Sequence, residues 1–67
     1  MIRLNGEDCD LRAGATVAAA LAQLDLSPEA KGVAVAVDGE VVPRAQWGLF
    51  ALADHARVEV LTAMQGG

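Results

Sequence analysis

Hydrophobic and polar residues alternate with a period of two near both ends of the chain, which is the pattern of half-buried β-strands. Residues 2–5 alternate in this way, and residues 8–12 do so again. Between them stands Asn5-Gly6, a strong hairpin signal because both residue types tolerate positive φ. Residues 57–62 repeat the alternation. The pattern therefore predicts an N-terminal hairpin and a separate final strand.

The middle of the chain predicts a second hairpin. Residues 33–37 are apolar at every position because Val alternates with Ala, and such a strand is typical of the centre of a sheet with a helix over one side. Asp38-Gly39 is a further hairpin signal. The return strand over residues 41–42 ends at Pro43, since proline has no N–H for a strand ladder.

One helix is predicted between the two hairpins. Apolar residues recur there at i, i+3, i+4 and i+7, on one face of a helix: Val17, Ala20, Leu21 and Leu24. Thr16 precedes them and is the expected N-cap. A further turn is expected at residues 27–29, with Ser27 as its cap and Pro28 at its first helical position.

The order of elements is strand, strand, helix, strand, strand, irregular segment, strand, with Trp47 and Phe50 anchoring the irregular part. This order predicts an α+β roll in which the helix packs on one face of a mixed sheet. The β-grasp (ubiquitin-like) fold has this order and places its first and last strands side by side in the middle of the sheet. We therefore expect a β-grasp domain over residues 1–62 and a flexible tail over residues 63–67.

Charge and composition argue against several classes of function. The net charge is −4 and the pI is near 4.6, with five scattered basic residues, so neither nucleic acid nor an anionic membrane is an expected partner. No apolar stretch is long enough to span a bilayer. Cys9 is the only cysteine and His55 the only histidine, so we expect no internal disulfide and no conventional zinc site. A lone thiol without a targeting segment fits the cytoplasm.

The remaining polar side chains offer little chemistry. We expect Cys9 to face the core as a small hydrophobe and His55 to be a solvated turn residue. The acidic residues at 7, 8 and 10 are expected on an exposed strand and turn rather than in a metal site. The chain has no evident acid–base pair or phosphate-binding loop. We therefore expect no metal, no catalytic residue and no enzymatic activity of its own.

The last two residues carry the strongest candidate chemistry. Gly66 and Gly67 have no side chain and accept a wide range of φ, so a narrow tunnel in another protein can admit them. An α-carboxylate with a pKa of about 3.5 is ionised and nucleophilic at neutral pH. Fully extended, residues 63–67 would reach about 17 Å. A loose end has the same composition, so the meaning of the pair depends on what precedes it.

Residues 33–47 resemble the motif of the thiamine-biosynthesis sulfur-carrier proteins, a family of small ubiquitin-like proteins. In that family a valine-rich strand runs into Asn-Gly, then Val-Pro-Arg, then a tryptophan three residues on. The matching residues here are Val33, Val35, Val37, Gly39, Val42, Pro43, Arg44 and Trp47. The opening Asn-Gly, the threonine-led helix and the terminal Gly-Gly match as well, so the likeness covers nearly the whole chain.

Two positions depart from the family's pattern. Asp38 stands where Asn is usual, and Ala53-Asp54-His55 replaces the more usual Gly-Asp turn before the last strand. A hairpin turn tolerates the first change, and neither change touches the tail.

The resemblance implies a sulfur carrier that is a co-substrate of partner enzymes. An E1-like adenylyltransferase binds the tail and ATP, and the Gly67 carboxylate attacks the α-phosphate to form an acyl-adenylate. Sulfur from a cysteine-desulfurase-derived persulfide displaces AMP and leaves a thiocarboxylate, which thiazole synthase uses for the thiazole ring of thiamine. ATP and sulfur thus arrive through the partners, with no bound cofactor. Gly66, Gln65 and Met64 would be recognised as the tail.

Three residues before the last strand are candidate partner contacts. Arg44 can pair with an acidic group of a partner or cap local carbonyls. Trp47 and Phe50 can be interface anchors, but in a domain with two aromatic residues we expect them to pack in a small core.

Three other functions share parts of this pattern. The small subunit of molybdopterin synthase is a β-grasp sulfur carrier with the same kind of tail. A ubiquitin-like modifier would conjugate the tail to lysines. A plain interaction module would use the domain surface and leave the glycines idle.

Overall fold

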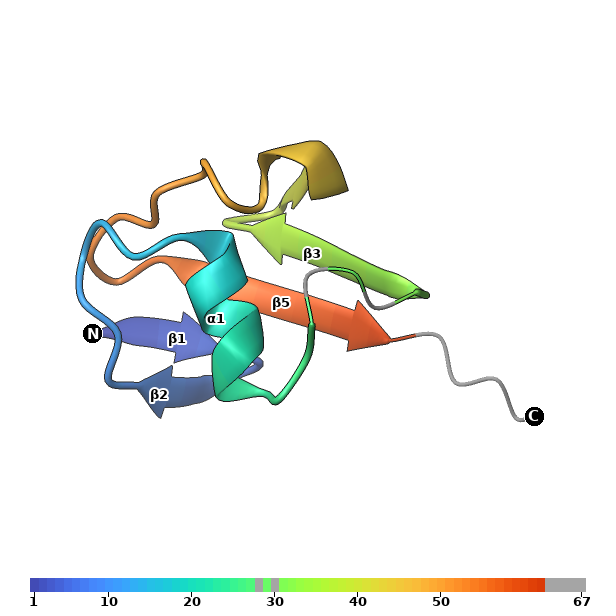
Figure 1. Cartoon of the computed structure of the whole chain (residues 1–67). Helices are drawn as coiled ribbons and strands as arrows, with labels where there is room; N and C mark the ends of the chain where they lie inside the picture. Colours follow the sequence, from blue (N-terminus) through green and yellow to red (C-terminus); the bar gives the residue numbers. More distant parts are fainter. Residues whose placement is uncertain (28, 30, 63–67) are drawn as a thin grey trace.

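The computed structural model describes residues 1–27, 29 and 31–62, and its elements follow the predicted order (Figure 1). The elements are β1 (Ile2–Leu4), β2 (Glu7–Cys9), α1 (Val17–Gln23), β3 (Val33–Val37), β4 (Glu40–Val42), the 3₁₀ helix η1 (Arg44–Gln46) and β5 (Arg57–Thr62). The irregular segment predicted after β4 thus begins with one short helical turn.

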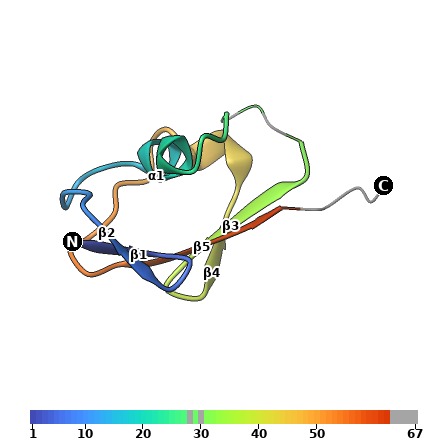
Figure 2. The same ribbon diagram turned by 90° about the horizontal axis from the view of Figure 1, so that it is seen from below.

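The five strands form one mixed sheet in the order β2-β1-β5-β3-β4. β1 and β5 are parallel, with Arg3 opposite Arg57 and Leu4 opposite Val58, and the other neighbouring strands are antiparallel. The first and last strands therefore lie side by side in the middle of the sheet. Together with one helix on one face, this is the predicted β-grasp fold (Figure 2).

Both hairpin turns have the conformation that their sequences predict. φ is 52° at Asn5 and 83° at Gly6, and it is 50° at Asp38 and 87° at Gly39. Positive φ at both central residues belongs to the type I′ turn, whose twist matches that of the flanking strands. Asn and Asp are among the few residue types other than glycine that enter this region readily.

The strand predicted over residues 8–12 is shorter than expected. β2 ends at Cys9 because the N–H of Leu11 donates to the Cys9 carbonyl at 2.8 Å, which closes a tight three-residue turn. Cys9 and Leu11 are both half-buried and pack against the core, as their alternation predicted.

The helix begins as predicted and ends one residue early. The Thr16 hydroxyl accepts the N–H of Ala19 at 3.3 Å, and Val17, Ala20 and Leu21 are buried. Leu24, the predicted i+7 position, lies after the last helical residue and is 37% exposed.

The early end has a local cause in a Schellman motif. Asp25 has a φ of 58°, its N–H donates to Ala22 at 3.1 Å, and the N–H of Leu26 donates to Leu21 at 3.0 Å. These two bonds satisfy helix carbonyls while the chain reverses. The reversal leaves Leu24 as the C-cap, at the end of the helix face that the spacing predicted.

We expect the substitution Asp25→Gly to raise the free energy of unfolding by about 1 kcal/mol, because glycine adopts positive φ without a Cβ clash and the change removes an anion from the helix C-terminus. Asp25→Ala is the matched control, since it removes the same charge but keeps the clash. Urea unfolding measures both variants. Equal gains in the two variants would assign the whole effect to charge and contradict a strained Asp25.

The core fills the space between α1 and one face of the sheet. Its buried residues are Ile2, Leu4, Val17, Ala20, Leu21, Val35, Val37, Val42, Trp47, Leu52, Ala56, Val58 and Val60. β3 lies between β5 and β4, as its all-apolar sequence predicted. Its valines face the core, while Ala34 is exposed on the other face.

The connection after α1 is described in part. The Ser27 hydroxyl accepts the N–H of Glu29 at 3.1 Å, as expected of a cap, and Gly32 has a φ of 73°. Pro28, predicted at the first helical position, lies outside the described residues.

Candidate functional site

The predicted reactive end of the chain continues from the central strand of the sheet. Residues 63–67, with Gly67, Gly66, Gln65 and Met64, lie outside the described residues, so the predicted domain and tail boundary stays a prediction. Thr62 is the last residue of β5 and pairs with Val33. β5 pairs with β1 at Arg57 and Val58 and with β3 from Val58 to Thr62, so the last described residue is held by its pairing with β3 (Figure 1).

Two hairpin turns hold β5 by the same device. Asn5 donates its N–H to Val58 at 2.9 Å, and its side-chain oxygen accepts the N–H of Val60 at 2.7 Å. Asp38 donates its N–H to Arg57 at 2.8 Å, and its carboxylate accepts the Arg57 N–H at 3.0 Å. Each turn residue thus bonds twice to the same central strand. Asp38 fits where Asn is usual because both residue types present an Oδ1 acceptor.

We expect Asn5→Gly to lower the free energy of unfolding by about 1–2 kcal/mol, because it keeps the positive φ but removes the acceptor of the Val60 N–H. Asn5→Asp keeps an Oδ1 acceptor and should lose less. Urea denaturation with tryptophan fluorescence measures the difference. Wild-type stability of Asn5→Gly would show that the side-chain clamp contributes nothing.

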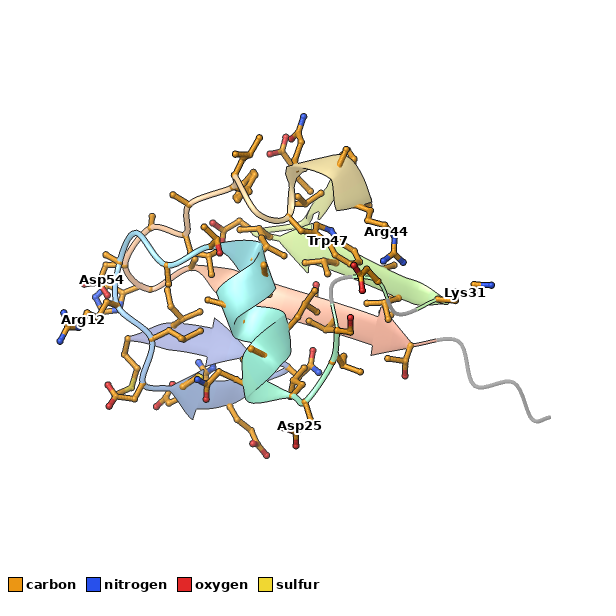
Figure 3. All side chains as sticks on the ribbon, in the orientation of Figure 1. Arg12, Asp25, Lys31, Arg44, Trp47 and Asp54 are labelled. Carbon is orange, nitrogen blue, oxygen red and sulfur yellow. The ribbon has the colours of Figure 1, made fainter. Side chains whose placement is uncertain are left out.

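The Val-Pro-Arg segment closes over the indole of Trp47. The ring is 2% exposed, and its Nε1 donates to the Val42 carbonyl at 2.9 Å. The Arg44 guanidinium lies 4.5 Å from the ring centroid, within range of a cation–π contact (Figure 3). Trp47 is thus a core residue in this structure, and Arg44 is the exposed side chain that covers it.

Phe50 is half-buried against the same core. The structure therefore shows the packing role that the sequence favoured for the two aromatic residues. An interface role for Arg44, Trp47 and Phe50 stays a prediction.

The turn before β5 contains an ion pair that the sequence did not reveal. The Asp54 carboxylate accepts from the Met1 ammonium at 2.7 Å, and this hydrogen bond lowers the pKa of Asp54 below its ordinary value. His55 has a φ of 67° and its side chain is 83% exposed, so it is the solvated turn residue that we expected. The partners are 53 residues apart, which no local pattern indicates.

The described part of the chain contains no candidate metal centre. Its residues contain no group of three or more His, Cys, Asp or Glu side chains placed to bind a metal ion. Glu7, Asp8 and Asp10 are exposed on and after β2. Within the same ranges, no helix has the length and apolar character that crossing a bilayer requires.

A family model described as the ThiS family matches residues 2–67 of the sequence. The chain belongs to the ThiS family. The matched residues include the Val-Pro-Arg segment and the terminal glycines, on which the resemblance was based. No curated protein matches the chain.

Two solved structures share the fold along nearly the whole chain. The crystal structure of thiamine biosynthesis protein ThiS from Geobacter metallireducens is 29% identical, with a TM-score of 0.73 and coverage of 98% of this chain and 97% of that one. A solution NMR structure of a thiamine biosynthesis protein from the same organism is 29% identical, with a TM-score of 0.76 and coverage of 98% and 86%. ThiS membership and these likenesses support a sulfur carrier of thiamine biosynthesis that interacts with the enzymes of that pathway.

Proposed function

We propose that this ThiS-family chain carries sulfur for the thiazole ring of thiamine as a thiocarboxylate on Gly67. The observation that carries the proposal is the family match, which extends through the terminal glycine pair. The anchoring of β5 is consistent with it, because a central strand whose last residues are paired with β3 gives partners a fixed point from which to reach the last residues.

The chemistry needs three partner activities. An adenylyltransferase binds ATP, and a Gly67 carboxylate oxygen attacks the α-phosphorus and releases pyrophosphate. The terminal sulfur of an enzyme persulfide then attacks the acyl carbon and displaces AMP. A thiol reduces the resulting acyl disulfide and frees the thiocarboxylate, whose sulfur thiazole synthase takes up. The chain is a co-substrate and supplies no catalytic residue, and ATP enters only with the partner.

The side chains divide into two groups in this scheme. The partners recognise the tail at Gly66, Gln65 and Met64. The absence of side chains at its end lets the tail enter a narrow tunnel. Arg44 offers a cation at the surface, beside the packed rings of Trp47 and Phe50. All of these steps take place in the cytoplasm.

The test is the intact mass of the protein after incubation with ATP, the adenylyltransferase of its host and a sulfur donor. The expected product has exchanged one oxygen for one sulfur, and fragmentation places the sulfur on Gly67. Oxidation of Met1 or Met64 adds nearly the same mass, so alkylation selective for thiocarboxylates accompanies the measurement. No adenylate and no sulfur, with partners active on a control carrier, would favour a plain interaction module.

A further inference from the structure

The sheet face that lies away from α1, here called the open face, carries side chains from all five strands. Figure 2 shows α1 and η1 over one face of the sheet and no described element over the other. Side-chain alternation along the strands places eight residues on the open face: Arg3, Asp8, Ala34, Ala36, Val41, Arg57, Glu59 and Leu61.

One half of the open face is apolar. Leu61 is 69% exposed and lies opposite Ala34, and Val41 is 75% exposed and lies opposite Ala36. These four residues, here called the apolar strip, run across β5, β3 and β4. A contiguous exposed apolar patch beside polar residues is typical of an interaction site.

The other half holds two arginines side by side. Arg3 and Arg57 are direct partners in the parallel pairing of β1 and β5, at the centre of the sheet. Like charges directly opposite each other destabilise a sheet. In the ranges that the structure describes, neither guanidinium forms an ion pair, although Asp8 lies opposite Arg3 and Glu59 follows Arg57 by two residues. The fold therefore tolerates a repulsion that it does not neutralise.

The arginine pair lines a shallow hollow of about 600 Å³ together with Asn5, Gly6, Glu59, Val60 and Leu61. Two of the five basic residues of a chain with net charge −4 are gathered here. A guanidinium presents N–H donors in a planar fork that matches the two oxygens of a carboxylate. The hollow thus joins a carboxylate-binding group to the edge of the apolar strip.

We propose that the Arg3–Arg57 pair is a binding site for an acidic side chain of the adenylating partner, which covers the apolar strip at the same time. This inference rests on the proposed function, because it names the partner of that function. Leu61 is the residue before the end of β5, so a protein seated on the open face also holds the point from which the tail continues. Charge complementarity then determines the orientation of the bound partner, and the apolar strip supplies contact area.

The test compares ATP–pyrophosphate exchange by the adenylyltransferase with the wild type and with Arg3→Gln, Arg57→Gln and the double variant as substrates. The double variant is expected to raise KM for the carrier on the order of tenfold with kcat unchanged, and to make KM less sensitive to salt. Arg12→Gln is the matched control, because it removes the same charge from an exposed site outside the open face (Figure 3). Both single variants should be at least as stable as the wild type, since they relieve the repulsion.

Several results would overturn the inference. A double variant with wild-type KM shows that the arginine pair does not bind the partner. An equal rise in KM for Arg12→Gln shows the same, because the effect then comes from net charge. If sedimentation shows that the wild type is a dimer and the double variant a monomer, the open face binds a second copy of the chain. Loss confined to sulfur transfer assigns it to thiazole synthase. No exchange with the wild type overturns the proposed function itself, whereas exchange with equal KM values overturns only this inference.

Discussion

Removal of Gly67 is expected to abolish sulfur loading and leave the melting temperature unchanged. The shortened chain still ends in a carboxylate, on Gly66, but that carboxylate stops about 3.3–3.6 Å short of the reacting position. Misplacement on the order of 1 Å is already enough to slow an enzymatic reaction about a hundredfold. Thiocarboxylate-selective alkylation after incubation with the partners measures the loss.

Gly67→Ala is the companion variant, because it keeps the length and adds one methyl group. We expect it to adenylate or transfer poorly, since a tunnel shaped to glycine leaves no room for a Cβ. Calorimetry should give the wild-type melting temperature for both variants. A marked drop in melting temperature would mean that the end of the chain packs against the domain, and normal loading of the shortened chain would refute the role of Gly67.

Trp47→Ala is expected to lower the free energy of unfolding by about 3–5 kcal/mol, the range for removing a large aromatic side chain from a core. A domain of 67 residues has a total stability of roughly 5 kcal/mol. The variant should therefore retain about 0–2 kcal/mol of stability and be partly unfolded at 37 °C. Circular dichroism and thermal melting measure this directly.

Trp47→Phe keeps an aromatic ring but removes the Nε1 donor to the Val42 carbonyl and part of the buried ring volume. We expect a loss of about 1–2 kcal/mol. Leu49→Ala is the control in the same segment, since Leu49 is 83% exposed and should change stability by less than about 0.5 kcal/mol. Comparable losses in Trp47→Phe and Leu49→Ala would show that neither the indole bond nor the extra ring volume contributes to stability.

The parts of the fold that the sequence predicts are those with local causes. Asn5-Gly6 and Asp38-Gly39 specify their turns through their own φ preferences. Thr16 caps the helix by accepting the N–H of Ala19, only three residues further along the chain. Spacing alone misled at Leu24, because periodicity does not register the left-handed residue that follows it. The alternation after Cys9 also misled, because it does not register the tight turn between Cys9 and Leu11 that ends the strand.

The parts that the sequence does not predict join residues far apart along the chain. The Asn5 bond to Val60 spans 55 residues, and the Arg3–Arg57 pair exists only because β1 and β5 are parallel and in that register. No local pattern carries either fact. For the site, the family match confirms the resemblance on which the tail chemistry depends, whereas the roles of Gly67 and its neighbours stay predictions.

The central place of the last strand also determines how the protein can be made. A chain leaves the ribosome N-terminus first, so the β1–β2 and β3–β4 hairpins are synthesised before β5, the strand that joins them. Isolated hairpins are marginal in water, and long-range pairing is slow. Folding of the sheet therefore waits until β5 has been synthesised, and a chain truncated before β5 has two hairpins without the strand that pairs with both. Any copy that reaches a partner with a closed sheet has been translated through its final strand.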